Sequence, residues 1–254
     1  MELRVLGCSG GIGESRKTTS FMVDGEVLID AGSGVGSLSL DEMARIKHIF
    51  LTHSHLDHVH AIPLLVDSIF DRIDEPIVVH GLPETIQALQ SHIFNWVIWP
   101  DFTRLPHPDS PVLAFEPMQP GECYRVGDNT YEMVPVYHIV PTVGYLISSP
   151  TATFAFSGDT TTNDTLWDAL NAQPRLDMLV VEAAFSNEEE DLCRLSRHYC
   201  PKLLGADLLK LNHNPKICIT HAKPGEEEQI YQECRESIVG RQLVHLSGGE
   251  VFTL

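Results

Sequence analysis

Short apolar runs alternate along the chain with segments whose apolar residues recur at helical spacing. Apolar runs bounded by turn formers predict buried strands, and apolar positions at i, i+3 and i+4 predict helices. The predicted strands are 2–7, 19–23, 26–29, 46–51, 76–80, 131–136, 143–148, 152–156, 176–181 and 217–220, and the predicted helices are 38–46, 61–73, 84–94, 203–211 and 226–237. Because these elements alternate with short connections, we expect one mixed α/β domain over residues 1–254.

The strand predicted at 46–51 leads into the densest chemical motif of the chain, His53-Ser54-His55-Leu56-Asp57-His58. On an extended backbone His53 and His55 point to the same side. Asp57 and His58 follow where the chain turns, and they can face a second point nearby. A histidine-rich surface loop is the alternative, but four ligand-type residues in this pattern favour a site for two metal ions that share a nucleophile.

Other predicted strands also stop at residues that can bind metal. Loops at strand ends converge on one crevice in open sheets, so side chains there can meet. Any one of these residues alone would more often be structural, but their occurrence together with the motif at 53–58 favours a shared site. They are Asp30, Asp159, Glu182 and His221, with His138 in the loop after the strand at 131–136.

Composition narrows the partners. With 17 basic and 35 acidic residues the chain carries a net charge of −18, so it repels polyanions, and a long nucleic acid is a poor substrate for it. A small anion drawn in by bound dications fits this charge. The six scattered cysteines form no CxxC pair, which favours free thiols in a reducing cytoplasm. We find no apolar stretch that could span a bilayer and no signal peptide, so we expect a cytoplasmic protein without membrane contact.

The sequence leaves the roles of two further stretches undecided. Three glycines in Gly10-Gly11-Ile12-Gly13 allow either a tight turn beside the site or direct contact with a ligand, and the sequence lacks the ending of a phosphate-binding P-loop. The segment 94–102 holds Trp96 and Trp99. For these aromatic residues we rank a core plug first, a dimer interface second and a stacking wall for a planar ligand third.

The motif at 53–58 has the HxHxDH form of the metallo-β-lactamase superfamily, which the chain resembles from about residue 3 to its end. Within the superfamily it is most similar to the class II cyclic-nucleotide phosphodiesterases. The stretches that carry this resemblance are Leu56-Asp57-His58, Phe94-Asn95 with Ile98-Trp99-Pro100, 138–145, Ser157-Gly158-Asp159-Thr160, Glu182-Ala183-Ala184-Phe185, 196–198 with Pro201, and 219–224.

The resemblance implies a four-layer αββα sandwich with a dinuclear centre at one edge. It implies that His53, His55 and His138 hold one metal, that Asp57, His58 and His221 hold the other, and that Asp159 bridges both. Imidazoles and carboxylates without a thiolate suit Zn²⁺ first, and they also accept Mn²⁺ or Fe²⁺. The resemblance and the two tryptophans favour a homodimer.

On this basis we expect hydrolysis of 3′,5′-cyclic nucleotides, cAMP and also cGMP, to 5′-monophosphates by a metal-bridging hydroxide that Asp57 orients. The departing alkoxide needs a proton, for which His198 is the candidate donor with Glu182 as its partner. A surface or helix-capping role is the alternative for His198. Asp30 is expected to hold a ligand histidine or a loop rather than metal.

Two other functions compete. A tRNA 3′-processing endonuclease carries a comparable late Glu and His, but the basic arm it uses for RNA has no counterpart here, and the charge of −18 also opposes it. A non-catalytic metal-binding protein would be favoured by a missing ligand, yet every ligand position is filled.

Overall fold

The computed structural model describes residues 1–254 and contains two seven-stranded β-sheets that pack face to face. The first sheet has the order β16 (Val251–Thr253), β1 (Glu2–Gly7), β2 (Ser20–Val23), β3 (Val27–Ile29), β4 (His48–Phe50), β5 (Ile77–Gly81) and β8 (Leu113–Pro117). The second has the order β15 (Leu243–His245), β14 (Lys216–Thr220), β13 (Met178–Glu182), β12 (Thr153–Phe156), β11 (Val143–Ser148), β10 (Asn129–Pro135) and β9 (Cys123–Val126). A separate short hairpin joins β6 (Pro106–His107) to β7 (Ser110–Pro111).

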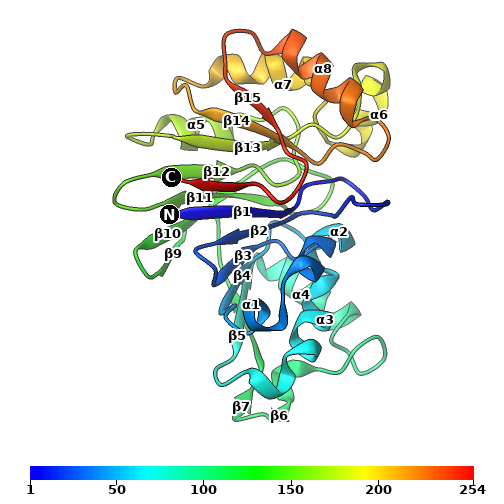
Figure 1. The fold of residues 1–254 in the computed structure, drawn as a ribbon, viewed down its shortest axis with the longest axis vertical. Helices are drawn as coiled ribbons and strands as arrows, with labels where there is room; N and C mark the ends of the chain where they lie inside the picture. The colour runs from blue at the N-terminus through cyan, green and yellow to red at the C-terminus, as the bar shows by residue number, and fades with distance from the viewer.

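Helices cover the outer face of each sheet (Figure 1). Beside the first sheet lie α1 (Leu40–Met43), α2 (Leu56–Val59), α3 (Ala61–Ser68) and α4 (Pro83–His92). Beside the second lie α5 (Thr165–Asn171), α6 (Glu190–Ser196), α7 (Pro201–Asp207) and α8 (Glu227–Ser237). The order helix, sheet, sheet, helix is the expected four-layer αββα sandwich, so the predicted fold class is confirmed. None of these helices is both long and apolar enough to cross a membrane.

Burial on both faces explains why the strands appear in the sequence as continuous apolar runs. On β4, Phe50 packs between the sheets, whereas its neighbour Ile49 packs against the helices of the first sheet. On β13, Val180 lies between the sheets, while Leu179 and Val181 contact the helices of the second. Side chains alternate between two apolar layers, so no polar position interrupts the run.

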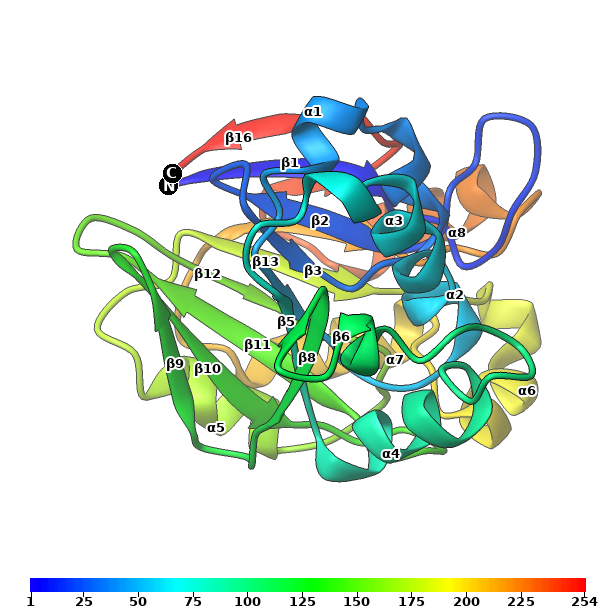
Figure 2. The same cartoon turned by 90° about the horizontal axis from the view of Figure 1, so that it is seen from below.

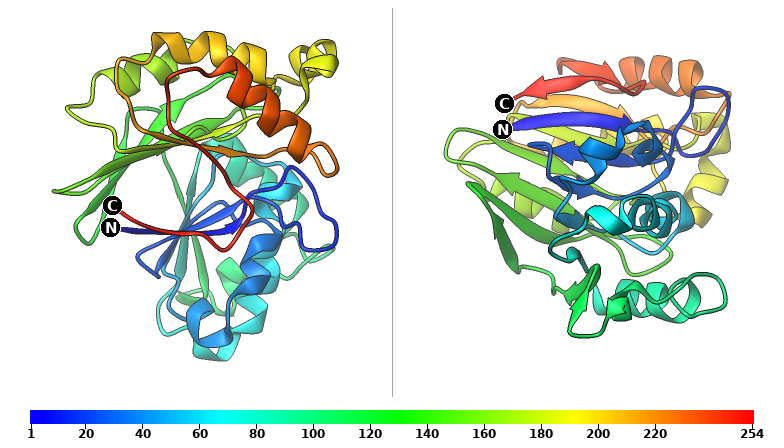
Figure 3. Two further views of the ribbon diagram at one scale, coloured as in Figure 1. Left: turned by 45° about the horizontal axis from the view of Figure 1, so that its top comes forward. Right: turned by 60° about the horizontal axis from the view of Figure 1, so that its bottom comes forward.

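The parallel strands bring their carboxyl ends to one edge of the sandwich. Strands β3, β4 and β5 pair in parallel, and so do β12, β13, β14 and β15. Ser9, just after β1, forms bridges with Thr18 and with Ala222, and thereby joins the two sheets at this edge. Figure 2 and the right panel of Figure 3 show the loop after β1, α2 and α6 gathered there. The loops that follow the parallel strands therefore face a common crevice.

The predicted helices are longer than the observed ones. The segment 38–46 forms an α-helix only over Leu40–Met43, begun by a capping box at Ser39, and the segment 61–73 ends its helix at Ser68. Ile46 and Ile69 are nevertheless buried outside the helices. Apolar spacing reports which side chains face the core, and it does not report where the hydrogen-bonded turns stop.

The pattern missed several elements, among them α5, α6, β15 and β16. The last strand is the clearest case, since Val251 is exposed and the strand gains its place by pairing antiparallel with β1. The chain crosses from the second sheet to the first through Gly248 and Gly249, both at positive φ. As a result the two termini lie side by side (Figure 1), and the amino group of Met1 donates to the carbonyl of Leu254. Pairing between chain ends leaves no local signal.

The aromatic segment is split between core and surface. Phe94 and Phe102 are buried and Trp99 packs against the core, but Trp96, Val97 and Ile98 are 58%, 85% and 63% exposed. Asn95 fixes this turn, because its Oδ1 accepts from the amides of Val97 and Ile98. The core-plug interpretation is therefore wrong for the three residues at the tip of the turn.

Candidate metal centre and proton donor

The motif at 53–58 folds so that its four ligand-type residues divide into two groups. His55 keeps an extended backbone (φ −64°, ψ 145°) and precedes the single turn of α2, which carries Asp57 and His58. His53 and His55 meet His138 and Asp159 in the first group, and Asp57 and His58 meet His221 in the second. Within each group the candidate ligand atoms lie within 4.8 Å of one another. Each group therefore combines residues from both sheets.

Asp159, which follows β12, lies between the groups. Its Oδ2 is 3.7 Å from His53 Nε2 and 3.2 Å from His221 Nε2, and its Oδ1 is 3.4 Å from His58 Nε2. The preceding Gly158 has φ +60°, and a Cβ there would lie 2.6 Å from the carbonyl oxygen of Val143. Glycine thus permits the tight turn that directs this carboxylate at both groups.

Four of the histidines form a hydrogen bond through Nδ1 on the side away from the centre, which leaves Nε2 to face the centre. His58 Nδ1 donates to Asp30 Oδ2 at 2.7 Å, and His138 Nδ1 donates to the Arg197 carbonyl at 2.9 Å. The other two bonds run from His53 Nδ1 to Thr52 Oγ1 at 3.0 Å and from His221 Nδ1 to Thr19 Oγ1 at 3.4 Å. His55 has the opposite orientation, with Nδ1 3.4 Å from His138 Nε2. Such outer bonds fix the tautomer and the direction of each lone pair.

Asp30 organises the first-sheet ligands and is fully buried. Besides the bond from His58, its two oxygens accept from the amide and the hydroxyl of Thr52, each at 2.8 Å. Because the Thr52 hydroxyl donates to Asp30, it can accept from His53. Asp30 thus supports one histidine of each group, as an outer partner rather than as a ligand, which agrees with the expectation for this residue.

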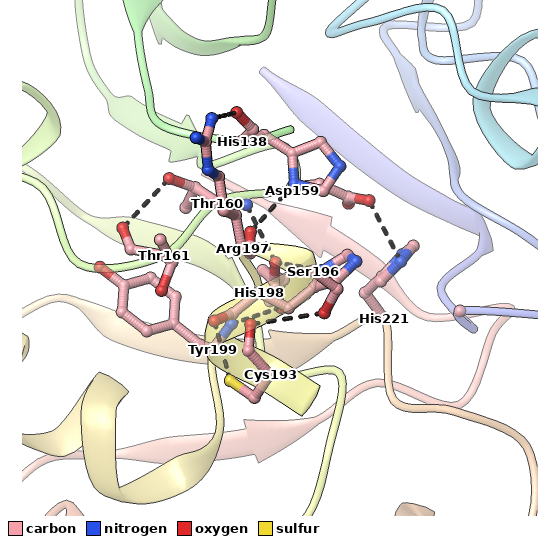
Figure 4. Close-up of polar contacts among 12 residues, drawn as sticks. His138, Asp159, Thr160, Thr161, Cys193, Ser196, Arg197, His198, Tyr199 and His221 are labelled. Atoms are coloured by element: carbon pink, nitrogen blue, oxygen red, sulfur yellow. Dashed lines mark hydrogen bonds and ion pairs between the residues drawn. The ribbon is translucent and has the colours of Figure 1, made fainter. Parts of the chain in front are cut away.

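His198 follows α6 and joins the crevice from the side of the second sheet (Figure 4). Its Nδ1 donates to Glu182 Oε1 at 2.7 Å, and Glu182 also accepts from the amides of Thr160 and Tyr199. With Asp159 and His221, His198 forms a third group of candidate ligand atoms within 4.8 Å of one another. The ring is buried, so a plain surface role for His198 is wrong.

Comparison with known proteins identifies the fold family. The profile of the β-lactamase superfamily domain matches residues 26–239, most of the chain. The chain belongs to the metallo-β-lactamase superfamily. The unliganded crystal structure of yeast PDE1 superposes with a TM-score of 0.85 at 20% identity, covering 100% of this chain and 99% of that one. The metallo-β-lactamase fold is thereby confirmed.

The sequence relatives include enzymes that cleave phosphodiesters. A 3′,5′-cyclic-nucleotide phosphodiesterase of Aliivibrio fischeri is 30% identical, and the match covers 95% of this chain and 86% of that protein. A ribonuclease Z of Bradyrhizobium sp. (strain ORS 278) is 34% identical, but the match covers only 44% of this chain and 36% of that protein. The predicted resemblance, and the prediction that the chain is an enzyme of phosphodiesterase type, are confirmed.

The metallo-β-lactamase fold implies divalent metal ions, and the side chains fit them. Nε2 of His53 and Nε2 of His58 are buried without any hydrogen-bond partner, which is costly unless a ligand binds there. Burial lowers the pKa of His53, His55 and His138, and it lowers the pKa of His221 to about 3, so these rings are neutral donors at neutral pH. The donor set is imidazole and carboxylate, without thiolate.

His58 and Asp159 show where the centre favours positive charge. Burial disfavours charge on His58, but the carboxylates of Asp159 and Asp30 outweigh it and raise the pKa of His58 well above its usual value. Burial likewise opposes charge on Asp159, yet the surrounding histidines hold the pKa of Asp159 well below its usual range. The carboxylates that favour a proton on His58 would equally favour a metal cation.

The surroundings of His198 favour its protonated form. Burial disfavours its charged form, but the charge of Glu182 and its hydrogen bond, together with Asp159, raise the pKa of His198 above the ordinary value. A raised pKa keeps the ring protonated to higher pH, as a proton donor to a leaving group requires.

Sequence reasoning named the residues at the centre and missed those that hold them. The structure brings the seven proposed ligands together, and it places Glu182 behind His198. Thr19, Thr52 and Arg197 were not predicted to contact ligand histidines. Only Thr52 offered a signal, since it directly precedes His53; the other two come from distant segments.

The glycine-rich stretch after β1 packs against the loop that carries a ligand. The Gly10 amide donates to the carbonyl of Ala222, and a Cβ on Gly10 would lie 2.5 Å from the carbonyl oxygen of His221. Of the two interpretations left open, this contact favours a tight turn beside the site.

Proposed function

We propose that this enzyme hydrolyses 3′,5′-cyclic nucleotides to 5′-monophosphates. The observation that carries the proposal is a histidine held by a buried carboxylate, His198 on Glu182, beside two converging groups of metal-ligand residues. A cyclic phosphodiester opens with an alkoxide leaving group, which departs only slowly without a proton. The near full-length relationship to a cyclic-nucleotide phosphodiesterase supports this substrate class.

His53, His55 and His138 would hold one divalent ion, Asp57, His58 and His221 the other, and Asp159 would contribute an oxygen to both. Such ions supply Lewis-acid stabilisation of phosphoryl charge and a water-derived nucleophile near neutral pH. We propose Zn²⁺, because buried neutral imidazoles dominate the donor set, with Mn²⁺ and Fe²⁺ as alternatives.

The side chains of the enzyme then divide the remaining work. Asp57, partly exposed beside His58 and His221, can accept a hydrogen bond from the attacking water and orient it. As water oxygen bonds to phosphorus and the bond from phosphorus to O3′ breaks, the His198 imidazolium gives its proton to O3′. The proton that the water loses passes to solvent, from which His198 is protonated again. Glu182 keeps Nδ1 of His198 occupied, so that the opposite nitrogen carries the transferable proton.

A tRNA 3′-processing endonuclease is the second candidate, because a ribonuclease Z is among the relatives. The net charge of −18 weighs against a polyanionic substrate, since phosphate contacts depend on Lys and Arg. The shorter match to ribonuclease Z also favours the cyclic nucleotide.

The deciding experiment is steady-state hydrolysis of cAMP and cGMP by purified protein with measured metal content, with bis-p-nitrophenyl phosphate and a precursor tRNA alongside. Conversion of either cyclic nucleotide to the 5′-monophosphate, more efficient than cleavage of the aryl diester, supports the proposal. Cleavage of the aryl diester and the precursor tRNA, without cyclic-nucleotide turnover, would assign the second candidate instead.

The exposed tip at Trp96, Val97 and Ile98 supports a second proposal, that the enzyme forms a homodimer through this turn. The turn is held rigid by Asn95, and such apolar tips commonly mark interfaces. Val97→Asp should shift the mass measured by light scattering from dimer to monomer. Val239→Asp is the matched control, because that valine is 83% exposed elsewhere on the surface. A monomeric parent protein would contradict this proposal.

A further inference from the structure

Arg197 ends α6 in an unusual backbone conformation. It has φ 56° and ψ 52°, which is the left-handed region, and it directly precedes His198. Glycine or asparagine normally occupies such a helix end, because a Cβ is strained there. An arginine at this position suggests that its side chain has a task that glycine could not perform.

Arg197 forms two hydrogen bonds with the candidate ligand His138, one through its carbonyl and one through its side chain (Figure 4). The Arg197 carbonyl accepts from the ring Nδ1 of His138 at 2.9 Å, and Arg197 Nη1 donates to the carbonyl of His138 at 2.7 Å. The guanidinium also stacks on the ring of Tyr137, 4.2 Å from its centroid. Ring and backbone of His138 are both fixed by this one residue.

Arg197 is also connected to His198, the proposed proton donor, through the backbone. His198 is bonded covalently to Arg197, and its own amide donates to the carbonyl of Cys193 at 3.0 Å. Since Glu182 fixes the ring of His198, neither end of this dipeptide can move without disturbing the other.

A second set of hydrogen bonds connects His138 with His198. The amide of Thr160 donates to Glu182 Oε1 at 2.9 Å, and Thr160 Oγ1 accepts from the amide of Tyr137 at 3.2 Å. Tyr137 is the covalent neighbour of His138. His138 and His198 are thus connected on one side through Arg197, and on the other through Glu182, Thr160 and Tyr137.

We propose that Arg197 is a positioning residue that sets the place of the proton donor His198 relative to the ligand His138. The inference rests on the proposed function, in which His138 helps to hold a divalent ion and His198 protonates the departing oxygen. A general acid acts only within hydrogen-bond reach, so a shift of about 1 Å can cost roughly 100-fold in rate.

A helix-capping role alone would give a different result on mutation. Glycine at residue 197 would relieve strain and keep the carbonyl that accepts from His138, while removing the guanidinium. If Arg197 were only a cap, Arg197→Gly would be harmless or stabilising. If it positions His198, the same substitution should impair the step that needs the proton.

The test compares Arg197→Gly, Arg197→Lys and the control Arg194→Ala, which lies on the same helix and contacts Glu190 at the surface. For Arg197→Gly we expect kcat on the cyclic nucleotide to fall about 30-fold, within the range for a misplaced acid. The fall on bis-p-nitrophenyl phosphate should be only about threefold, because a nitrophenolate leaves without a proton. Arg197→Lys should recover part of the loss, and Arg194→Ala should match the parent.

A second readout does not depend on turnover. Competition with a chelator should remove one metal from Arg197→Gly at about tenfold lower chelator concentration than from the parent, as expected for a lost outer contact to a ligand. Equal losses on both substrates, or an unchanged chelator midpoint, would overturn the positioning role. If the parent itself cleaves no cyclic nucleotide, the proposed function fails, and the chelator midpoint still decides whether Arg197 holds His138.

Discussion

The two sheets contribute to the centre in different ways. The first sheet supplies His53, His55, Asp57 and His58 from a single loop after β4, supported by the buried side chains of Asp30 and Thr52. The second sheet supplies its residues one loop at a time. These are His138, Asp159, His198 and His221, each from a different connection, and Glu182 at the end of β13.

The difference separates a local motif from a constellation that only the fold assembles. A six-residue loop can orient its own ligands with one buried carboxylate behind it, because the members are neighbours in sequence. On the second sheet the spacing of the site residues depends on strand register, on the turn at Gly158 and on the two hydrogen bonds between Arg197 and His138. The first sheet provides only candidate metal ligands, whereas the second provides candidate ligands and also His198, the proposed proton donor.

The largest effect is expected where the two contributions meet, at Asp159. Asp159→Ala removes the carboxylate that faces both ligand groups and leaves the surrounding imidazoles without their shared anion. We expect background activity and loss of at least one metal by elemental analysis. Asp164→Ala, which alters an exposed carboxylate near α5, should leave both unchanged. Full metal content with normal turnover would exclude Asp159 as the bridge.

His198→Ala tests the second sheet alone. The variant should keep both metals, and turnover of the cyclic nucleotide should fall by about 10²- to 10⁴-fold, the usual contribution of a general acid. Aryl diesters should be affected much less. Because His198 also lies in a ligand group with Asp159 and His221, its metal content must be measured; loss of an ion would make His198 a ligand instead of an acid.

Asp30→Ala tests the first sheet alone. It would leave the His58 ring and two donors of Thr52 buried without an acceptor. Breaking a buried charged pair costs about 3–5 kcal/mol, so the free energy of unfolding in urea should fall by that order. Metal affinity should drop about 10- to 100-fold, as for other outer contacts to ligands. An unchanged unfolding curve would show that Asp30 does not support the loop.

The smallest effect is a displaced pH profile in Glu182→Gln. Glu182 helps to raise the pKa of His198, so the amide should lower that pKa. An acid works only while protonated, so activity is present below its pKa and lost as pH rises through it. The basic limb of kcat/KM should therefore move to lower pH in the variant, as measured across buffered pH steps. A limb that stays in place would assign it to another group.

The contrast between the sheets also explains how far the sequence could lead. The motif at 53–58 identifies the family and the first-sheet ligands because its spacing is local. His138, Asp159 and His221 were proposed by resemblance and by their places after strands, and the fold brings them together. The contacts of Thr19 and Arg197 with histidines were not predicted, because a threonine or an arginine carries no sign of the distant histidine it contacts.

The elements of the fold also divide into those with a local signal in the sequence and those without one. Strands buried on both faces, such as β13, were recognisable from composition, whereas β16 depends on a partner from the opposite end of the chain. The turn at Trp96 to Ile98 is an exception to the rule that aromatic clusters are buried. Its side chains are exposed, and Asn95 fixes its backbone through the amides of Val97 and Ile98.

Each ligand group contains residues from both sheets. A metal ion bound in either group would therefore link the two sheets of the sandwich. Binding that is possible only when the sheets are docked adds to the stability of the docked state. By thermodynamic linkage this contribution is about 2.7 kcal/mol when free metal exceeds its dissociation constant roughly 100-fold. The melting temperature of this protein should therefore follow the concentration of free metal, and chelation should loosen the sandwich along the edge where the loops converge.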